Sequence, residues 1–96
     1  KIFRSYMNSN DLVEWILYIL ISSNKNTPVY NVGSDERISI VDLAEIIAKA
    51  YNKKLLINKQ EKNNIDYYVP SVEKAKKILN LRLKINLKKS LKEIFR

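Results

Sequence analysis

The 96-residue sequence has no cysteine and no histidine. Their absence excludes thiol nucleophiles, disulfides, zinc sites built from Cys or His, and every Ser-His or Cys-His catalytic arrangement. Any chemistry must therefore come from carboxylates, lysines, arginines, tyrosines or the backbone. A chain without cysteine also fits a reducing compartment.

Long apolar runs are missing as well. The longest one, Trp15 to Ile21, is far shorter than the roughly 20 residues that span a bilayer. No basic and apolar leader with a small-residue cleavage site precedes it. From these features we expect a cytoplasmic protein with no membrane partner.

The sequence does have enough apolar content, 46%, for one modest core, together with 29% charged residues. A chain of this length encloses one small domain or a piece of one, so residues 1–96 are treated as a single unit. Because the first residue is Lys1 rather than methionine, we expect a processed product or a piece of a longer protein.

The net charge of +8 is concentrated in the second half of the chain. Residues 1–52 carry five basic and six acidic side chains, whereas residues 53–96 carry thirteen and four. A basic half of this kind is typical of a small nucleic-acid-binding module or a surface for an acidic partner. Lysine predominates over arginine there, so a lysine-coated solvent face is the simpler interpretation, and nucleic acid is the less favoured partner.

Hydrophobic periodicity, strand propensity and capping residues predict short strands and about four helices. The clearest helix begins at a Ser39/Asp42 pattern related to the capping box. The first half is expected to contain a strand within 1–7, a helix over 11–22, a strand over 29–32 and a helix over 40–51. A strand over 54–58, an exposed loop over 59–64 and an extended segment over 67–70 are expected to follow. The last two elements are a helix over 71–80 capped by Ser71 and a helix capped by Asn86. This alternation indicates the α/β class.

The helix expected over 11–22 is apolar almost all round, so it must be covered on more than one side. The strand over 29–32 resembles an interior strand, yet few partners are available for it. Both features indicate that another domain or another protein covers this chain. A protein-interaction module, in which the first helix docks into a partner, is one such alternative.

The single glycine, Gly33, precedes the helix over 40–51. A dinucleotide-binding turn needs several glycines at G-x-G-x-x-G spacing, and here Asp35 and Glu36 would repel a phosphate. We expect Gly33 to be a structural turn residue in a backbone conformation that other residues tolerate poorly. Asp35 and Glu36 could form an acid/base pair, but no nucleophile is adjacent, and solvated turn carboxylates are the simpler interpretation.

Three residues are candidates for binding a substrate. Arg4 stands among apolar and aromatic residues, where it can bind a phosphate or carboxylate through paired donors or serve as an ordinary ion-pair partner. Tyr67 and Tyr68 can stack on a base or sugar, or pack the extended segment between helices. No tyrosine is followed four residues later by a lysine, and no catalytic, cofactor-binding or metal-binding residue is identified.

Three segments resemble, in order and spacing, a known family. "RSYMNSNDLVEWI" is similar to the R-D-[FY]-[IV]-H-V-x-D-L segment of NAD-dependent nucleotide-sugar epimerases and dehydratases, with matches at Arg4, Tyr6, Asp11 and Leu12. These enzymes form the extended short-chain dehydrogenase/reductase group. "VYNVGSDERISIVDLAEIIAKAY" is similar to their Y-N-[VL]-G stretch before a serine-capped helix, and "YYVPSVEKAKKILNL" to their [RY]-x-x-P-[DS]-x-x-K-A-x-x-x-L-G-[LWF] segment.

The resemblance implies the C-terminal, substrate-binding fragment of a Rossmann-type enzyme, spanning 1–96, without the N-terminal NAD-binding domain. It implies that Arg4 contacts the diphosphate or nucleoside end of a nucleotide-sugar, and that the whole enzyme, which could be a homodimer, binds NAD. The family's G-x-x-G-x-x-G and Y-x-x-x-K motifs are absent from this sequence. We therefore expect the isolated chain to bind no NAD and to be inactive.

Overall fold

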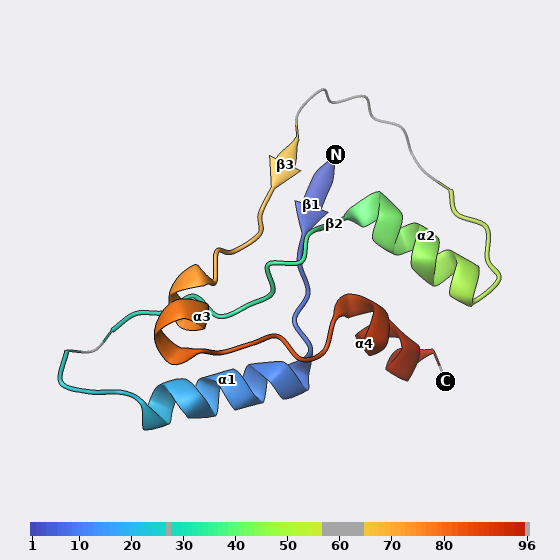
Figure 1. Ribbon diagram of the computed structural model, residues 1–96. Coiled ribbons are helices and arrows are strands. Elements are labelled where there is room, and N and C mark those ends of the chain that lie inside the picture. The colour runs from blue at the N-terminus through green and yellow to red at the C-terminus, as the bar shows by residue number, and fades with distance from the viewer. Residues whose placement is uncertain (27, 57–64, 96) are drawn as a thin grey trace.

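Four helices and three short strands make up the described part of the computed structural model, residues 1–26, 28–56 and 65–95 (Figure 1). Their order is β1 (Ile2–Arg4), α1 (Ser9–Ile21), β2 (Ile38–Ser39), α2 (Ile40–Ala50), β3 (Asp66–Tyr67), α3 (Glu73–Leu79) and α4 (Leu87–Ile94). The expected α/β class with four helices is confirmed at this level.

The three strands form one mixed sheet with β1 in the middle. β2 pairs with β1 in the antiparallel direction, with Phe3 opposite Ser39. β3 pairs with the other edge of β1 in the parallel direction, with Phe3 opposite Tyr67. The start of the chain therefore joins two segments that are far away in the sequence, and β1 provides one edge to each.

Side-chain caps start three of the helices, as their sequences predict. The Asn8 side chain accepts a hydrogen bond from the backbone N–H of Asn10, so α1 begins two residues earlier than expected. The Ser39 hydroxyl and the Asn86 side chain do the same at α2 and α4. These bonds satisfy donors that have no partner within the helix.

The prediction that Ser71 caps α3 is wrong. This helix starts at Glu73 after Val72, and no side chain caps it. Val72 is buried in the core, and the carbonyl of Ser71 accepts a hydrogen bond from the Asn31 side chain at 3.2 Å. Core packing and this tie to the segment before α2 set the start of α3.

One expected strand does not form, and a second does not form over its described residues. Residues 29–32 belong to no strand, because their polar groups bond to the region of α3: the Lys74 ammonium donates to the carbonyl of Val29 at 2.7 Å. Residues 54–56 are also not in a strand. The rest of that expected strand, 57–58, and the expected loop over 59–64 lie outside the described residues.

The core is small and lies between α1 and α3. It consists of Trp15, Val72, Ala75 and Leu81, with Tyr30 and Val32 among the partly buried residues around it. The indole N–H of Trp15 donates to the carbonyl of Arg82 at 3.0 Å, which satisfies the one polar group of the ring.

A buried carboxylate connects the start of α1 to the segment before α4. Asp11 is 1% exposed, and its two oxygens accept hydrogen bonds from the backbone N–H groups of Lys84 and Ile85, at 3.3 and 2.9 Å. A buried charge needs such partners, because an unsatisfied carboxylate would be strongly destabilising. Asp11 thus fixes the path of the chain between α3 and α4.

The expectation that Gly33 has a backbone conformation that other residues tolerate poorly is wrong, since its φ is not positive. A side chain is excluded there by proximity: a Cβ atom on Gly33 would lie 2.9 Å from Cγ of Pro70. Of the residues that the structure describes, Asn52 and Asn80 have positive φ, and Asn80 ends α3.

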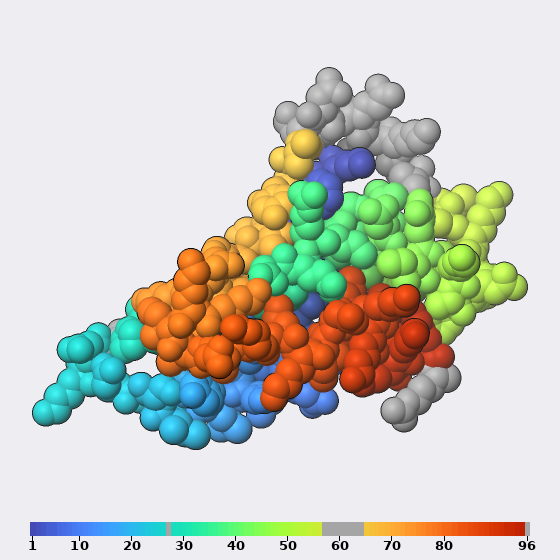
Figure 2. All heavy atoms as spheres, in the orientation of Figure 1, coloured from blue at the N-terminus to red at the C-terminus, as the bar shows by residue number. Residues whose placement is uncertain are grey.

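The molecule is flat and open, with principal extents of 52 × 36 × 15 Å. Figure 2 shows one face of it. Its radius of gyration is 16.5 Å, against roughly 12.5 Å for a compact chain of this length. Its accessible surface is 7937 Å², against roughly 5,700 Å² for a compact protein of this mass.

The first helix contributes much of this exposed surface. Trp15 faces the core, whereas Leu17, Leu20 and Ile21 are 53%, 66% and 81% exposed. Within the described ranges α1 is therefore covered on one side only, and the cover of its other sides by another domain or protein stays a prediction. No helix among the described residues is long and apolar enough to cross a membrane.

Candidate functional site

The three residues predicted to bind a substrate come together at the β1–β3 edge of the sheet. Arg4 is the last residue of β1, Tyr67 the last residue of β3, and Tyr68 follows directly. Phe3 pairs with Tyr67 in the parallel direction, so the C-terminal ends of β1 and β3 lie side by side. The backbone N–H of Tyr68 donates to the carbonyl of Phe3 at 3.1 Å. We call Arg4, Asp66, Tyr67 and Tyr68 the β1–β3 cluster.

The guanidinium group of Arg4 has a defined position in this cluster. Its Nη1 donates to the carbonyl of Phe3 at 2.7 Å, and its Nη2 lies 3.0 Å from Oδ2 of Asp66. The guanidinium carbon lies 6.0 Å from the ring centroid of Tyr68, at the limit of a cation–π contact. Backbone, carboxylate and ring together hold the positive charge beside the end of β1.

The two tyrosine rings differ in their surroundings. Tyr67 packs near Phe3, with ring centroids 6.0 Å apart and ring planes tilted by 48°. Tyr68 is 74% exposed, so most of its ring is open to a ligand. The Tyr67 ring thus packs in part against Phe3. The Tyr68 ring is largely exposed and lies beside the cation of Arg4.

The charge at the cluster is accessible to an anion. The Arg4 side chain is about one-third exposed and that of Asp66 nearly two-thirds, so solvent screens their ion pair. Pairs of this kind contribute about 0–1 kcal/mol. A diphosphate offers more acceptor oxygens and more negative charge than one carboxylate, so it can compete with Asp66 for the guanidinium.

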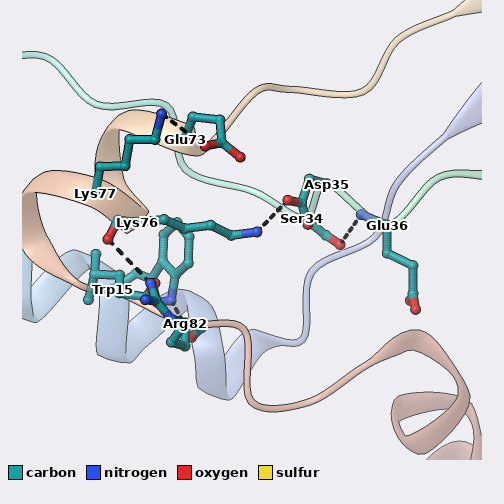
Figure 3. Close-up of polar contacts among 9 residues, drawn as sticks. Trp15, Ser34, Asp35, Glu36, Glu73, Lys76, Lys77 and Arg82 are labelled. Atoms are coloured by element: carbon teal, nitrogen blue, oxygen red, sulfur yellow. Dashed lines mark hydrogen bonds and ion pairs between the residues drawn. The ribbon is translucent and has the colours of Figure 1, made fainter.

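The carboxylates near Gly33 do not form an acid/base pair. Figure 3 shows the Asp35 and Glu36 side chains pointing in different directions, with Asp35 bound to the ammonium group of Lys76 on α3. Glu36 accepts a hydrogen bond from the backbone N–H of Leu87, at the start of α4, at 2.9 Å. Both residues are exposed, as expected for solvated turn carboxylates, and each also ties the loop to another element, which the sequence did not predict.

The same loop does not fit NAD. A pyrophosphate needs backbone N–H groups at a glycine-rich turn, and here the one glycine lies against Pro70 and is followed by two carboxylates. Among the described residues, no group of three or more Asp or Glu side chains could hold a metal ion. The residues of the β1–β3 cluster, one cation, one carboxylate and two tyrosine rings, have a chemistry suited to contact with an anion.

Sequence reasoning missed Asp66 in the cluster and the buried role of Asp11. Asp66 follows the expected loop over 59–64, and only the strand pairing brings it to Arg4. Asp11 was noted for the resemblance, but its partners are backbone groups more than seventy residues later. No local pattern in the sequence could have identified either partner.

Comparisons with known proteins do not place the chain in a family. No protein-family model, no curated protein and no solved structure gives a significant match to it.

Proposed function

We propose that this chain is the substrate-binding portion of an NAD-dependent nucleotide-sugar epimerase or dehydratase. Arg4 binds the diphosphate of the nucleotide-sugar, and Tyr67 and Tyr68 contact its nucleoside or sugar. A separate N-terminal portion holds NAD and the catalytic groups, in the cytoplasm, so this chain by itself performs no turnover. The resemblance of three ordered segments to that family is the sequence basis of the proposal.

The observation that carries it is the convergence of Arg4 with Tyr68. These residues lie in opposite parts of the sequence, and the guanidinium carbon of Arg4, at the end of β1, lies 6.0 Å from the ring centroid of Tyr68, directly after β3. A fixed cation beside an exposed aromatic ring suits a phosphate linked to a ring system, because the cation binds the charge and the ring stacks.

The exposed surface supports the need for a further domain. α1 carries Leu17, Leu20 and Ile21 largely in water, and the molecule has far more accessible surface than a compact chain of its mass. Contiguous apolar surface of this kind marks an interaction site in soluble proteins. The N-terminal NAD-binding portion is the occupant that the resemblance implies for α1.

Calorimetric titration of the 96-residue chain with UDP-glucose, dTDP-glucose and GDP-mannose tests the substrate-binding role. At least one of these should bind, and Arg4→Gln should weaken its binding about tenfold, because a charge-assisted hydrogen bond contributes about 1.5–3 kcal/mol. Arg37→Gln is the matched control: it removes the same charge near the Phe3 ring, 5.7 Å from its centroid, but outside the cluster.

Arg37→Gln should change the affinity less than about twofold, the range of a screened surface charge. Absence of binding by all three nucleotide-sugars, or equal losses in the two variants, would refute the proposal. NAD should give no heat above the dilution background.

A second candidate function is a protein-interaction module, and the exposure of α1 is the observation that favours it. In that case the free chain should associate with itself through α1, or be only marginally folded. Val13→Lys with Leu20→Lys, both at exposed α1 positions, should then restore a monomer. Analytical ultracentrifugation distinguishes the two candidates, because nucleotide-sugar binding at Arg4 does not require self-association.

A further inference from the structure

A groove lies between α2 and α4, beyond the β2 edge of the sheet and away from the β1–β3 cluster. Its volume is about 540 Å³, and apolar side chains from both helices line it, among them Ile38, Ile46, Leu91 and Phe95. Figure 1 places the two helices next to each other, and contacts at both ends support that arrangement.

The walls of the groove are fixed at each end. At one end, the rings of Tyr51 and Phe95 meet edge to face, with centroids 5.2 Å apart and planes at 86°. At the other end, Glu36 accepts the backbone N–H of Leu87 at 2.9 Å. These two contacts join the walls at the ends of the groove, and each contact already formed reduces the ordering that a partner must impose.

Positive charge follows both edges of the groove. Arg37 and Lys49 lie on the side of β2 and α2, and Lys88 and Lys92 lie on the side of α4. Lys49, Lys88 and Lys92 are exposed, and none of them forms an ion pair with another described residue. Glu36 is the one carboxylate in the lining, and it already accepts a hydrogen bond from the backbone N–H of Leu87.

We propose that this groove binds an acidic amphipathic helix of a protein partner. The complement of an apolar floor with cations on both edges is an apolar stripe with carboxylates on both sides. A small amphiphilic anion would need a cation at one point only, and a nucleic acid would make no use of the apolar floor. The face of α4 from Leu87 to Phe95 is about 12 Å long, which matches about two turns of a partner helix.

The test uses a designed, fluorescently labelled peptide of about 14 residues, enough for roughly four helical turns. It carries leucines at i, i+3, i+4 and i+7 with glutamates on both sides. One control peptide has the same composition in scrambled order, and another has lysine in place of every glutamate. Fluorescence anisotropy with the full 96-residue chain should detect binding of the ordered acidic peptide alone.

Two double variants locate the binding. Lys88→Gln with Lys92→Gln removes two cations of the groove, and Lys25→Gln with Lys54→Gln removes the same charge elsewhere on the exposed surface. We expect the groove variant to bind the acidic peptide at least fivefold more weakly and the control to change less than twofold. All four positions are exposed in the chain, so circular dichroism should report unchanged helix content.

A floor variant, Ile46→Gln, separates the apolar contribution from charge. Ile46 lines the groove and is 44% exposed. Its replacement by glutamine should lower the affinity for the ordered peptide at least threefold, and it leaves the net charge of the chain unchanged. Equal binding of the scrambled peptide would overturn the proposal, since it would indicate attraction by net charge alone. So would equal losses in the two lysine variants, or no binding of the ordered peptide.

Discussion

Nη2 of Arg4 lies 3.0 Å from Oδ2 of Asp66, and the parallel pairing of β1 with β3 brings the two residues together. A phosphate that binds the guanidinium must compete with this carboxylate for its donors. Asp66 is therefore the expected internal competitor of the anion that we propose as the ligand of Arg4.

Replacement of that carboxylate should strengthen ligand binding. We expect Asp66→Asn to raise the affinity for the bound nucleotide-sugar about threefold to fivefold, because it frees Arg4 and removes a like charge near the diphosphate. Asp35→Asn is the control, since Asp35 pairs with Lys76 and lies outside the cluster. Calorimetry should give no comparable gain for the control, and a loss of affinity in Asp66→Asn would contradict the competition.

The buried carboxylate of Asp11 should dominate the stability of the connection between α3 and α4. Asp11→Ala leaves the backbone N–H groups of Lys84 and Ile85 without acceptors and should lower the free energy of unfolding by about 2–4 kcal/mol. Asp11→Asn keeps one acceptor oxygen and should cost about half as much.

Urea unfolding followed by the fluorescence of Trp15, the single tryptophan, measures both changes. Glu14→Ala is the control, because Glu14 forms an exposed ion pair with Lys84 and should matter by less than about 1 kcal/mol. Equal effects of the Asp11 and Glu14 replacements would show that burial of Asp11 is unimportant.

The close approach of Gly33 to Pro70 predicts a steric cost for any side chain at position 33. Gly33→Ala should destabilise the fold by about 1–3 kcal/mol, because its Cβ would meet the rigid proline ring. Pro70→Ala in the same chain should recover about 1 kcal/mol or more of that loss, as expected for residues in direct contact. Additive effects in the double-mutant cycle would place the cost in the backbone of Gly33 instead.

The ion pair between Lys84 and Glu14 predicts that the stability of the folded state depends on pH in the alkaline range. The hydrogen bond that the Lys84 ammonium donates to Glu14, the negative charge of Glu14 and a smaller contribution from Asp11 raise the pKa of Lys84 above the usual 10.5, and desolvation lowers it in part. A raised pKa stabilises the folded state at every pH below the value in the unfolded chain. That stabilisation disappears as the pH rises through the higher value in the folded state.

Carbon-13 NMR of the lysine side chains can follow this titration directly. The Lys84 signal should titrate at a higher pH in the parent chain than in Glu14→Gln, because the variant removes the main cause of the shift. An unchanged Lys84 titration in the variant would contradict the assignment to Glu14.

The helices were predictable because their determinants are local. Ser39 and Asn86 cap α2 and α4 through bonds to residues three positions later, and a single window of sequence contains both partners. The start of α3 was not predictable, because Val72 is placed by the core around Trp15 rather than by a cap.

The strands and the candidate site depended on partners distant in sequence. Strand propensity at residues 29–32 is genuine, but a strand requires a neighbour, and Lys74 and Ser71 take up its polar groups instead. Arg4 could be identified as an unusual cation from the sequence, whereas its pairing with Asp66 required the register of β1 and β3. Propensity indicates which residues can form a strand, and tertiary contacts decide whether they do.

We propose, from the resemblance of the three segments, that these residues are the substrate side of a nucleotide-sugar enzyme whose NAD-binding side precedes them. The most direct measurement is the DNA sequence immediately upstream of the codon for Lys1. We predict an open reading frame of roughly one domain, about 100–200 residues, that carries G-x-x-G-x-x-G and then Y-x-x-x-K. A nearby start codon with neither motif would contradict the claim, and the protein-interaction module would then be the leading function.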